Sequence, residues 1–387
     1  MRVVMFYHSL VSDWENGNAH FLRGVAAELL ARGHRVSILE PADGWSRANL
    51  IREQGESVLG RFARTYPTLI SELYGPELDL DRILDPADLV LVHEWTDPAM
   101  VAAIGRHRAA GGRYRLLFHD THHRAVTRPD EMADYDLSQF DGVLAAGEMV
   151  QQRYLDAGWA RQAWTWHEAA DHRVFRPLPN HRLEGDLVWV GNWGDEQRTA
   201  ELEEFLIRPA EALKLRARVH GAGCPVEALV RLAEAGVDHG GWVPNFAVPG
   251  VFARFRFTVH IPHHPYAESL PGVPPIRVFE ALACGIPLLC APWEDREGLF
   301  TPGADYLVAQ DGLEMRRTLR ALMTNESAAR SLAEHGRRTI LARHTCVHRV
   351  NELLGIVAEL NRGRRRPVVA HPGHAPALGS PSSISTN

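Results

Sequence analysis

The stretch RVVMFYHSLVSDWENGNAHFLRGVAAELLARGHRVSIL, residues 2–39, decides the fold class. It opens with a short apolar run at 2–7, which predicts a buried strand, and continues through a polar loop. An amphipathic segment at 19–32 predicts a helix, and a further apolar run at 35–39 predicts a second strand. A strand, a helix and a second strand in this order indicate a parallel β-α-β unit with both faces covered.

The same alternation of apolar runs and helical segments continues along the chain. In the first half we expect further strands at 88–92, 114–118 and 142–146, and helices at 99–108 and 149–157. The second half repeats the pattern, with strands expected at 186–190, 216–220, 258–261, 287–290 and 306–308, and helices at 196–207, 226–235 and 276–283.

An irregular stretch at 171–183 interrupts the alternation and predicts a linker between two domains. We therefore expect an N-terminal domain at 1–175, a second domain at 184–345, a C-terminal helix at 346–361 and a disordered tail at 363–387. The fold class is α/β, with two doubly wound Rossmann-like domains. They should face each other across a cleft, because such sheets bind ligands at the carboxyl ends of their strands.

Composition argues against several function classes. The chain has 42 Lys+Arg against 48 Asp+Glu, a net charge of -6, which argues against a nucleic-acid partner. Lys214 is the one lysine in the sequence, so a Walker loop and a lysine Schiff base are implausible, and arginines would hold an anionic substrate. The four cysteines form no C-x-x-C pair, and no signal segment or membrane-length apolar run is present. We expect a cytoplasmic protein.

One glycine loop follows the first strand of each half of the chain, and both loops are candidates for binding an anion. Gly17 and Asn18 precede the first helix, where a turn without ligand is an equally plausible interpretation. Gly191 and Asn192 follow the strand at 186–190, and Arg198 lies on the next helical turn, as a diphosphate site requires. The alternative is that Asp195 only caps this helix and that Arg198 is solvated.

The segment PPIRVFEALACGIP, residues 274–287, is the most informative for function. A helix beginning here places Arg277 in its first turn and Glu280 in an otherwise apolar sequence. A carboxylate in such surroundings needs a partner. A ribose diol is one such partner, and an ion pair between Glu280 and an arginine is the other.

A histidine-rich segment, FHDTHH at residues 118–123, ends a strand of the first domain. His93 ends another strand of the same domain. These positions predict that Asp120, His119, His122 or His93 acts as a general base or holds sugar hydroxyl groups in the cleft. A metal site is the rival interpretation, which we do not favour because the spacing lacks the helical H-E-x-x-H pattern.

Taken in order, these motifs resemble those of a GT-B glycosyltransferase over residues 1 to about 360. The resemblance is to the CgeB-like (spore-maturation-type) group related to glycosyltransferase family 4. It is carried by the first glycine loop and by GHRV, DHRVFRP, GNW and IRVFEALACGIP, at 33–36, 171–177, 191–193 and 276–287.

The resemblance implies transfer of a hexose from a nucleotide-diphosphate-sugar donor, without metal or other cofactor. The nucleotide is expected in the second domain and the acceptor in the first. Glu280 matches the carboxylate that holds the ribose, Arg277 and Arg198 match positions near the diphosphate, and Gly17 is expected near the transferred sugar.

The sequence departs from related retaining enzymes at two points. The basic pair usual in those enzymes includes a lysine, and this sequence has none in the region. The other departure concerns a glutamate. The related enzymes carry a glutamate eight residues before the ribose glutamate, and that position is Gly272 here. We expect the backbone amides of Gly272 and Val273 to contact the donor sugar instead. The acceptor, whether small molecule, glycan or protein, is not specified by any motif.

Two other functions fit the same features. One is a nucleotide-sugar epimerase, which needs no acceptor groove, and the other is a non-catalytic relative that binds nucleotide-sugars or serves as a scaffold. The arginine-rich run at 362–366 is an alternative contact for anionic lipid, although such runs are more often solvated.

Overall fold

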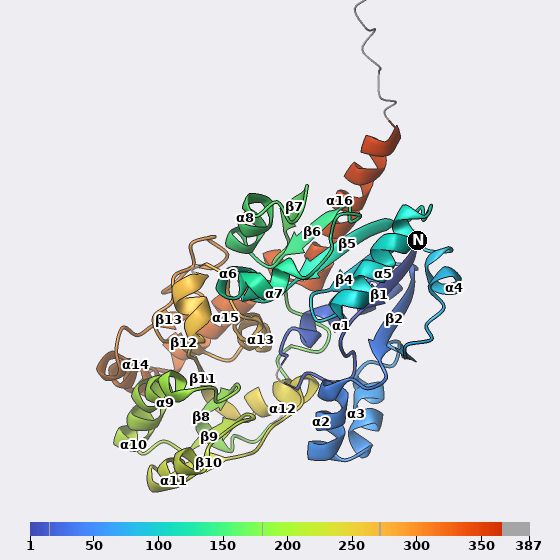
Figure 1. Cartoon of the computed structure of the whole chain (residues 1–387). Helices are drawn as coiled ribbons and strands as arrows, with labels where there is room; N and C mark the ends of the chain where they lie inside the picture. The colour runs from blue at the N-terminus through green and yellow to red at the C-terminus, as the bar shows by residue number, and fades with distance from the viewer. Residues whose placement is uncertain (15, 180, 271, 366–387) are drawn as a thin grey trace, which may run out of the picture.

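Two parallel β-sheets, each covered by helices, form the protein in a computed structural model that describes residues 1–14, 16–179, 181–270 and 272–365 (Figure 1). The arrangement confirms the predicted α/β class with two doubly wound sheets. The central strands β4 (Leu89–His93) and β5 (Arg115–Asp120) are buried along their whole length, as expected of strands with helices on both faces.

The first sheet has seven strands in the order β3-β2-β1-β4-β5-β6-β7. Its remaining strands are β1 (Arg2–Phe6), β2 (Arg35–Pro41), β3 (Ser71–Tyr74), β6 (Gly142–Ala145) and β7 (Ala163–Thr165). Its helices are α1 (Ala19–Ala31), α2 (Trp45–Gln54), α3 (Ser57–Thr65), α4 (Leu80–Leu84), α5 (Pro98–Ala109), α6 (Arg124–Thr127), α7 (Pro129–Ala133) and α8 (Glu148–Asp156). Strand order reverses between β1 and β4, so the loop after β1 lies at the switch point where such sheets bind ligands.

The second sheet has six strands in the order β10-β9-β8-β11-β12-β13. They are β8 (Gly185–Val190), β9 (Ala217–His220), β10 (Val237–His239), β11 (Phe255–His260), β12 (Leu288–Cys290) and β13 (Leu307–Val308). Its helices are α9 (Glu196–Leu202), α10 (Arg208–Leu213), α11 (Val226–Glu234), α12 (Val248–Phe252), α13 (Ile276–Cys284), α14 (Gly312–Thr324) and α15 (Glu326–Arg343), with single turns η1 (Glu203–Ile207), η2 (Asn245–Ala247) and η3 (Pro265–Ser269). The order reverses between β8 and β11, which places the loop after β8 at the second switch point.

The last helix, α16 (Cys346–Arg365), returns from the second sheet to pack against α1 of the first (Figure 1). The chain crosses between the sheets twice, and a parallel bridge between Ala170 and Thr345 joins the two crossings. The helix predicted at 346–361 continues to Arg365, past the expected start of the tail at 363, and residues 366–387 lie outside the described residues.

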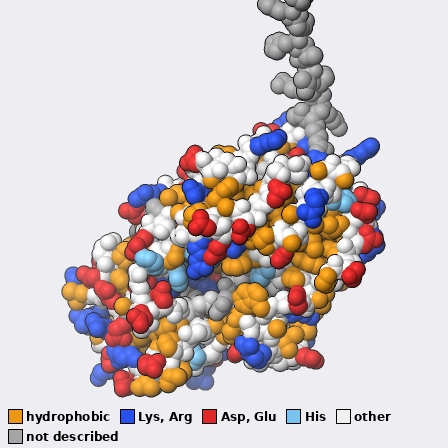
Figure 2. Space-filling model, in the orientation of Figure 1, with side chains coloured by type: hydrophobic (Ala, Val, Ile, Leu, Met, Phe, Trp, Pro, Cys, Tyr) orange, Lys and Arg blue, Asp and Glu red, His pale blue; other side chains and the backbone are white. Residues whose placement is uncertain are grey.

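The surface carries both signs of charge. On the face drawn in Figure 2, acidic and basic side chains are interspersed, as the near balance of the composition predicts. None of the helices in the described part of the chain has the length and apolar character needed to cross a bilayer.

Candidate functional site

Two adjoining cavities lie between the sheets, one of about 70 Å³ and the other of about 290 Å³. They share lining residues from the loops that follow β1 and β8 and from the start of α13, namely Asn16, Gly17, Val190, Gly191, Asn192 and Arg277. Four of the predicted donor-binding residues are therefore brought together at one shared wall. An elongated ligand that follows this wall would reach from one cavity into the other.

The glycines at this wall permit contacts that no other residue allows. A Cβ on Gly17 would lie 2.9 Å from Cγ2 of Ile276, and a Cβ on Gly191 would lie 2.7 Å from the Trp189 ring. A Cβ on Gly221 would come within 1.8 Å of the Gly191 carbonyl oxygen. Only glycine lets these loops pack so closely against each other and against α13.

The smaller cavity has an aromatic wall. Trp242 lines it together with His220, Gly221 and Val243. The Trp14 ring, from the first domain, packs on Trp242 with 4.9 Å between ring centroids. A flat aromatic surface beside backbone polar groups suits a planar heterocycle.

Arg198 lies in the wall of the larger cavity and is 6% exposed. Its Nη1 donates to the carbonyl oxygens of Ile261 and Pro262 at 2.6 and 3.0 Å, and burial lowers the pKa of its guanidinium. The Asp195 carboxylate accepts the Arg198 backbone N–H and caps α9, as the alternative interpretation expected, but the Arg198 side chain is not solvated. Two of its donors are thus committed to the protein, and its contact with a diphosphate stays a prediction.

Glu280 is fully buried and is not among the described residues that line either cavity. Its Oε1 accepts hydrogen bonds from His20, at 2.9 Å, and from Asn245, and its Oε2 forms an ion pair with Arg277. The arginine ion pair considered as the alternative to ribose binding is therefore present. A ribose contact, which stays a prediction, would require a movement that opens this fully buried carboxylate to a cavity.

The tautomer of His20 follows from its two hydrogen bonds. Its Nε2 accepts the backbone N–H of Asp171 at 2.7 Å, so the ring proton is on Nδ1, which donates to Glu280. The neutral ring stacks on Phe175 with centroids 3.7 Å apart. His20 on α1 thereby contacts both Asp171, where the chain first crosses between the domains, and α13 of the second domain.

The predicted acceptor-side residues separate in the structure. His119 is fully buried against Phe21 and Trp166, and burial lowers its pKa to about 3. Asp120 is also fully buried, and its carboxylate accepts from the Tyr154 hydroxyl at 2.8 Å and from the His122 backbone N–H at 2.9 Å. Neither His119 nor Asp120 is among the described cavity-lining residues, because both side chains pack inside the sheet layers. Their catalytic roles stay predictions.

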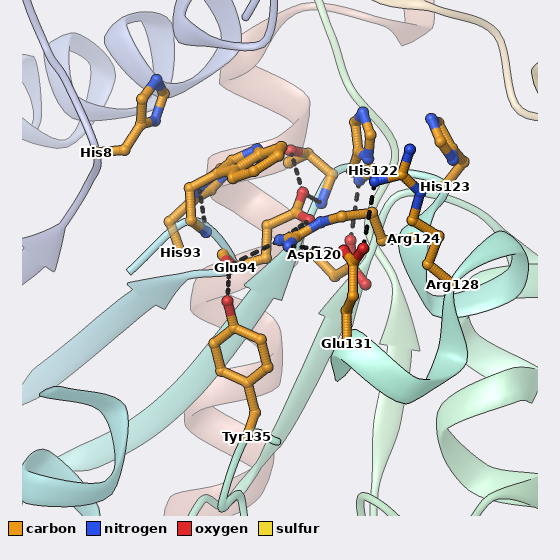
Figure 3. Close-up of polar contacts among 12 residues, drawn as sticks. His8, His93, Glu94, Asp120, His122, His123, Arg124, Arg128, Glu131 and Tyr135 are labelled. Atoms are coloured by element: carbon orange, nitrogen blue, oxygen red, sulfur yellow. Dashed lines mark hydrogen bonds and ion pairs between the residues drawn. The ribbon is translucent and has the colours of Figure 1, made fainter. Parts of the chain in front are cut away.

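Asp120 belongs to a buried cluster of charged residues with Glu94 and Arg124, drawn in Figure 3. Arg124 Nη2 donates to the carboxylate of Glu94 at 3.0 Å, and Arg124 lies 3.9 Å from the centroid of the Trp95 ring. Burial, and then the charge of neighbouring Asp120, raise the pKa of Glu94, and burial also raises the pKa of Asp120. Ionisation of both carboxyl groups together is therefore disfavoured, while Arg124 holds Glu94 in place.

Of the other predicted residues, three line the larger cavity and one does not. His122, Asn18 and Val273 line it, and Asn18 Nδ2 donates to the Thr121 carbonyl oxygen at 3.0 Å. Gly272 is not in the lining of either cavity, and its backbone has a φ of 104°, a conformation that favours glycine. Val273 therefore lines the larger cavity and Gly272 does not, and the contact of their backbone amides with a donor sugar stays a prediction.

Sequence reasoning missed several residues of the larger cavity, namely Asn16, Trp95, His123, Glu168, His260 and His263. Asn16 and Trp95 adjoin residues that were considered, whereas Glu168 belongs to no motif. Its only signal was that it is the one acidic residue in the stretch 163–170, which is mostly Ala and Trp.

Across the described residues, no group of three or more His, Cys, Asp and Glu side chains is placed to hold a metal ion. The histidine-rich segment instead directs its side chains to different surroundings. His119 is inside the core, whereas His122 and His123 line the larger cavity.

Part of the sequence matches a known family. Residues 198–355 match the family described as "Glycosyl transferase-like", which covers most of the second domain and less than half of the chain. No curated protein sequence gives a significant match.

Solved structures of very different sequence superpose on nearly the whole chain. Sucrose-phosphate synthase from Thermosynechococcus elongatus is 14% identical and covers 94% of this chain and 100% of its own, with a TM-score of 0.62. HepE from Anabaena, solved in complex with UDP and glucose, is 13% identical and covers 93% and 100%, with a TM-score of 0.63. The chain has the GT-B fold. An α-glucosyltransferase solved with UDP and a 13-mer DNA shares this GT-B arrangement at 12% identity, covering 92% and 99%, with a TM-score of 0.66.

Proposed function

We propose that this GT-B protein is a glycosyltransferase that moves a sugar from a nucleotide-diphosphate-sugar to an acceptor hydroxyl group. The observation that carries the proposal is the pair of adjoining cavities, which meet at the two glycine loops and the first turn of α13. The family match over residues 198–355 and the neighbours solved with UDP or UDP-glucose support the same activity.

The cavities suggest how the donor would lie. The nucleobase would stack in the smaller cavity against Trp242, and the diphosphate would follow Gly191 and Asn192 to Arg277 and the amino end of α13. The sugar and the acceptor would then share the larger cavity. This division agrees with the expected roles of the two domains.

The reaction needs stabilisation of the leaving group. An acceptor hydroxyl oxygen bonds to the anomeric carbon while the bond from that carbon to the diphosphate oxygen breaks. The electron pair leaves on the nucleoside diphosphate, and the hydroxyl proton passes to a base or to the leaving phosphate. Arg277 and the helix dipole of α13 would stabilise the developing charge without a metal ion. Hexose as the transferred group, a cytoplasmic location and the CgeB-like relation belong to this proposal.

Thermal stabilisation by nucleotide-sugars tests the proposal. A donor at a hundred times its Kd stabilises the folded protein by about 2.7 kcal/mol. We expect one of UDP-glucose, GDP-mannose, ADP-glucose or dTDP-glucose to raise the melting temperature of wild type equally with and without magnesium.

The variant Arg277→Gln loses the charge while keeping a donor for Glu280, so donor affinity should fall about 10-fold, the loss typical of a charge-assisted hydrogen bond. The control is Arg218→Gln on β9, where Arg218 pairs with Glu184 and Asp238 away from both cavities. Equal shifts in Arg277→Gln and wild type would contradict the proposed diphosphate site.

One observation favours a second candidate, a non-catalytic protein that binds nucleotide-sugars. All three partners of Glu280 come from the protein, which leaves the ribose carboxylate engaged. Release of free sugar from the bound donor, measured over hours without acceptor, would favour the transferase, and tight binding with no turnover would favour the second candidate.

A further inference from the structure

Glu168 lies in the wall of the larger cavity, between β7 and the first crossing of the chain. The residue is 5% exposed, and its Oε1 has no hydrogen-bond partner within the described structure. Of the described residues that line this cavity, it is the one with a carboxyl group. A buried polar atom without a partner is costly, so its retention at a cavity wall points to a ligand.

The surroundings of Glu168 favour its neutral form. Burial raises the pKa of its carboxyl group well above the usual value, and the charges of Glu280 and Glu94 raise it further. A hydrogen bond from the backbone amide of Ile276, at the start of α13, opposes this rise. A neutral carboxyl group both donates and accepts hydrogen bonds, which matches a sugar hydroxyl and avoids repulsion of a neighbouring diphosphate.

The position of Glu168 indicates which end of the donor it would contact. Glu168 lines the larger cavity and not the smaller one, so it lies on the far side of the shared wall from Trp242. A group bound there would be the sugar rather than the nucleoside.

Glu168 also supplies a group that Gly272 does not. A Cβ on Gly272 would lie 3.0 Å from Cβ of Arg296, and the residue faces neither cavity. The carboxyl group in the wall of the larger cavity therefore comes from the segment between β7 and the first crossing, and not from the loop before α13.

We propose that Glu168 hydrogen-bonds a hydroxyl group of the donor sugar and positions that sugar in the larger cavity. The inference rests on the proposed function and adds to it the residue that distinguishes a nucleotide-sugar from the bare nucleotide.

Paired titrations with nucleotide and nucleotide-sugar test this role. Calorimetry would compare UDP with UDP-glucose, and the corresponding GDP, ADP and dTDP pairs, on wild type, Glu168→Ala, Glu168→Gln and the control Glu326→Ala on α15. For the pair that wild type binds, Glu168→Ala should weaken the nucleotide-sugar at least 10-fold and change the bare nucleotide less than 3-fold. Glu168→Gln should keep nucleotide-sugar affinity within 3-fold, because an amide also donates and accepts.

The outcomes separate the inference from the proposed function. Equal affinities of wild type and Glu168→Ala for the nucleotide-sugar would overturn the inference and leave the proposed function standing. Equal weakening of nucleotide and nucleotide-sugar would also overturn it, since the residue would then act on the shared part. A folded wild type that binds none of the compounds would contradict the proposed function, and the inference would fall with it. Melting curves without ligand establish that each variant is folded.

Discussion

The His119 ring is enclosed by aromatic side chains, and neither of its nitrogens has a hydrogen-bond partner in the described structure. Such a group costs free energy in the folded state, because its polar atoms lose water without replacement. Its neighbour Asp120, two residues from the cavity-lining His122, is fully hydrogen-bonded inside the protein. At this scale a single segment thus combines a core histidine, a buried carboxylate and a cavity residue.

Replacing His119 by leucine, which has a similar volume, should therefore stabilise the protein by about 1 kcal/mol at pH 7.5. The effect should depend on pH. The pKa of His119 is depressed to about 3, below the unfolded value of about 6.5. Above about pH 6.5 the ring is neutral in both states and titration has no effect on stability. As the pH falls from about 6.5 toward 3 the unfolded state binds a proton that the folded state does not, so wild type loses stability.

At pH 5 the advantage of His119→Leu over wild type should exceed that at pH 7.5 by about 2 kcal/mol. Urea unfolding at both pH values measures it, and His239→Leu at an exposed position is the control. A variant whose advantage is the same at both pH values would show that the ring is not neutral and buried as described.

The β1–α1 loop of the first domain packs directly against the start of α13 of the second domain. Gly17 touches Ile276, the first residue of α13, and both line the larger cavity. The proposed diphosphate site depends on the close approach of these two elements. A methyl group added at Gly17 would push the loop away from the backbone amides at the start of α13.

We expect Gly17→Ala to weaken nucleotide-sugar binding about 10-fold, with a loss of stability of about 1 kcal/mol from the crowding. Gly250→Ala on α12 is the matched control, since a Cβ there meets nothing within 4 Å and should stabilise the helix slightly. Thermal shift with and without ligand gives both quantities. Unchanged affinity in Gly17→Ala would remove this loop from the site.

The sequence predicts the elements better than their partners. Alternating apolar runs and helical segments locate the central strands and α13, because burial on both faces imposes a local pattern. An arginine partner of Glu280 was one of the two alternatives, but His20 could not be predicted, since it lies on α1 of the first domain, 260 positions away. Glu168 was missed for a related reason, as only the fold brings the segment after β7 to the cavity wall.

The whole molecule is held together by polar contacts between its two parts as well as by α16. Glu297, in the loop after β12, accepts the backbone N–H of Glu148 at 2.9 Å and so caps α8 of the first domain from outside. The same carboxylate pairs with His167 beside the crossing segment. Glu297 therefore links the second domain to the first beside His167, the residue before Glu168.

Removing this link should loosen the junction between the domains. In Glu297→Ala the α8 amide loses its capping acceptor, a change that costs about 1 kcal/mol. Hydrogen exchange at the first turn of α8 should accelerate several-fold. The control is Glu294→Ala, three residues earlier, where the carboxylate pairs only with Arg296 on the surface within the described structure. Identical exchange in both variants would show that Glu297 does not hold the domains together.

The return of α16 to α1 also orders the events of biosynthesis. Helix α1 emerges from the ribosome long before α16, yet α16 covers part of its apolar face, including the contact between Gly24 and Cys346. Until translation reaches α16, this apolar face of α1 therefore stays uncovered on the nascent first domain. We expect products of premature termination to be removed by proteolysis rather than to persist as free domains.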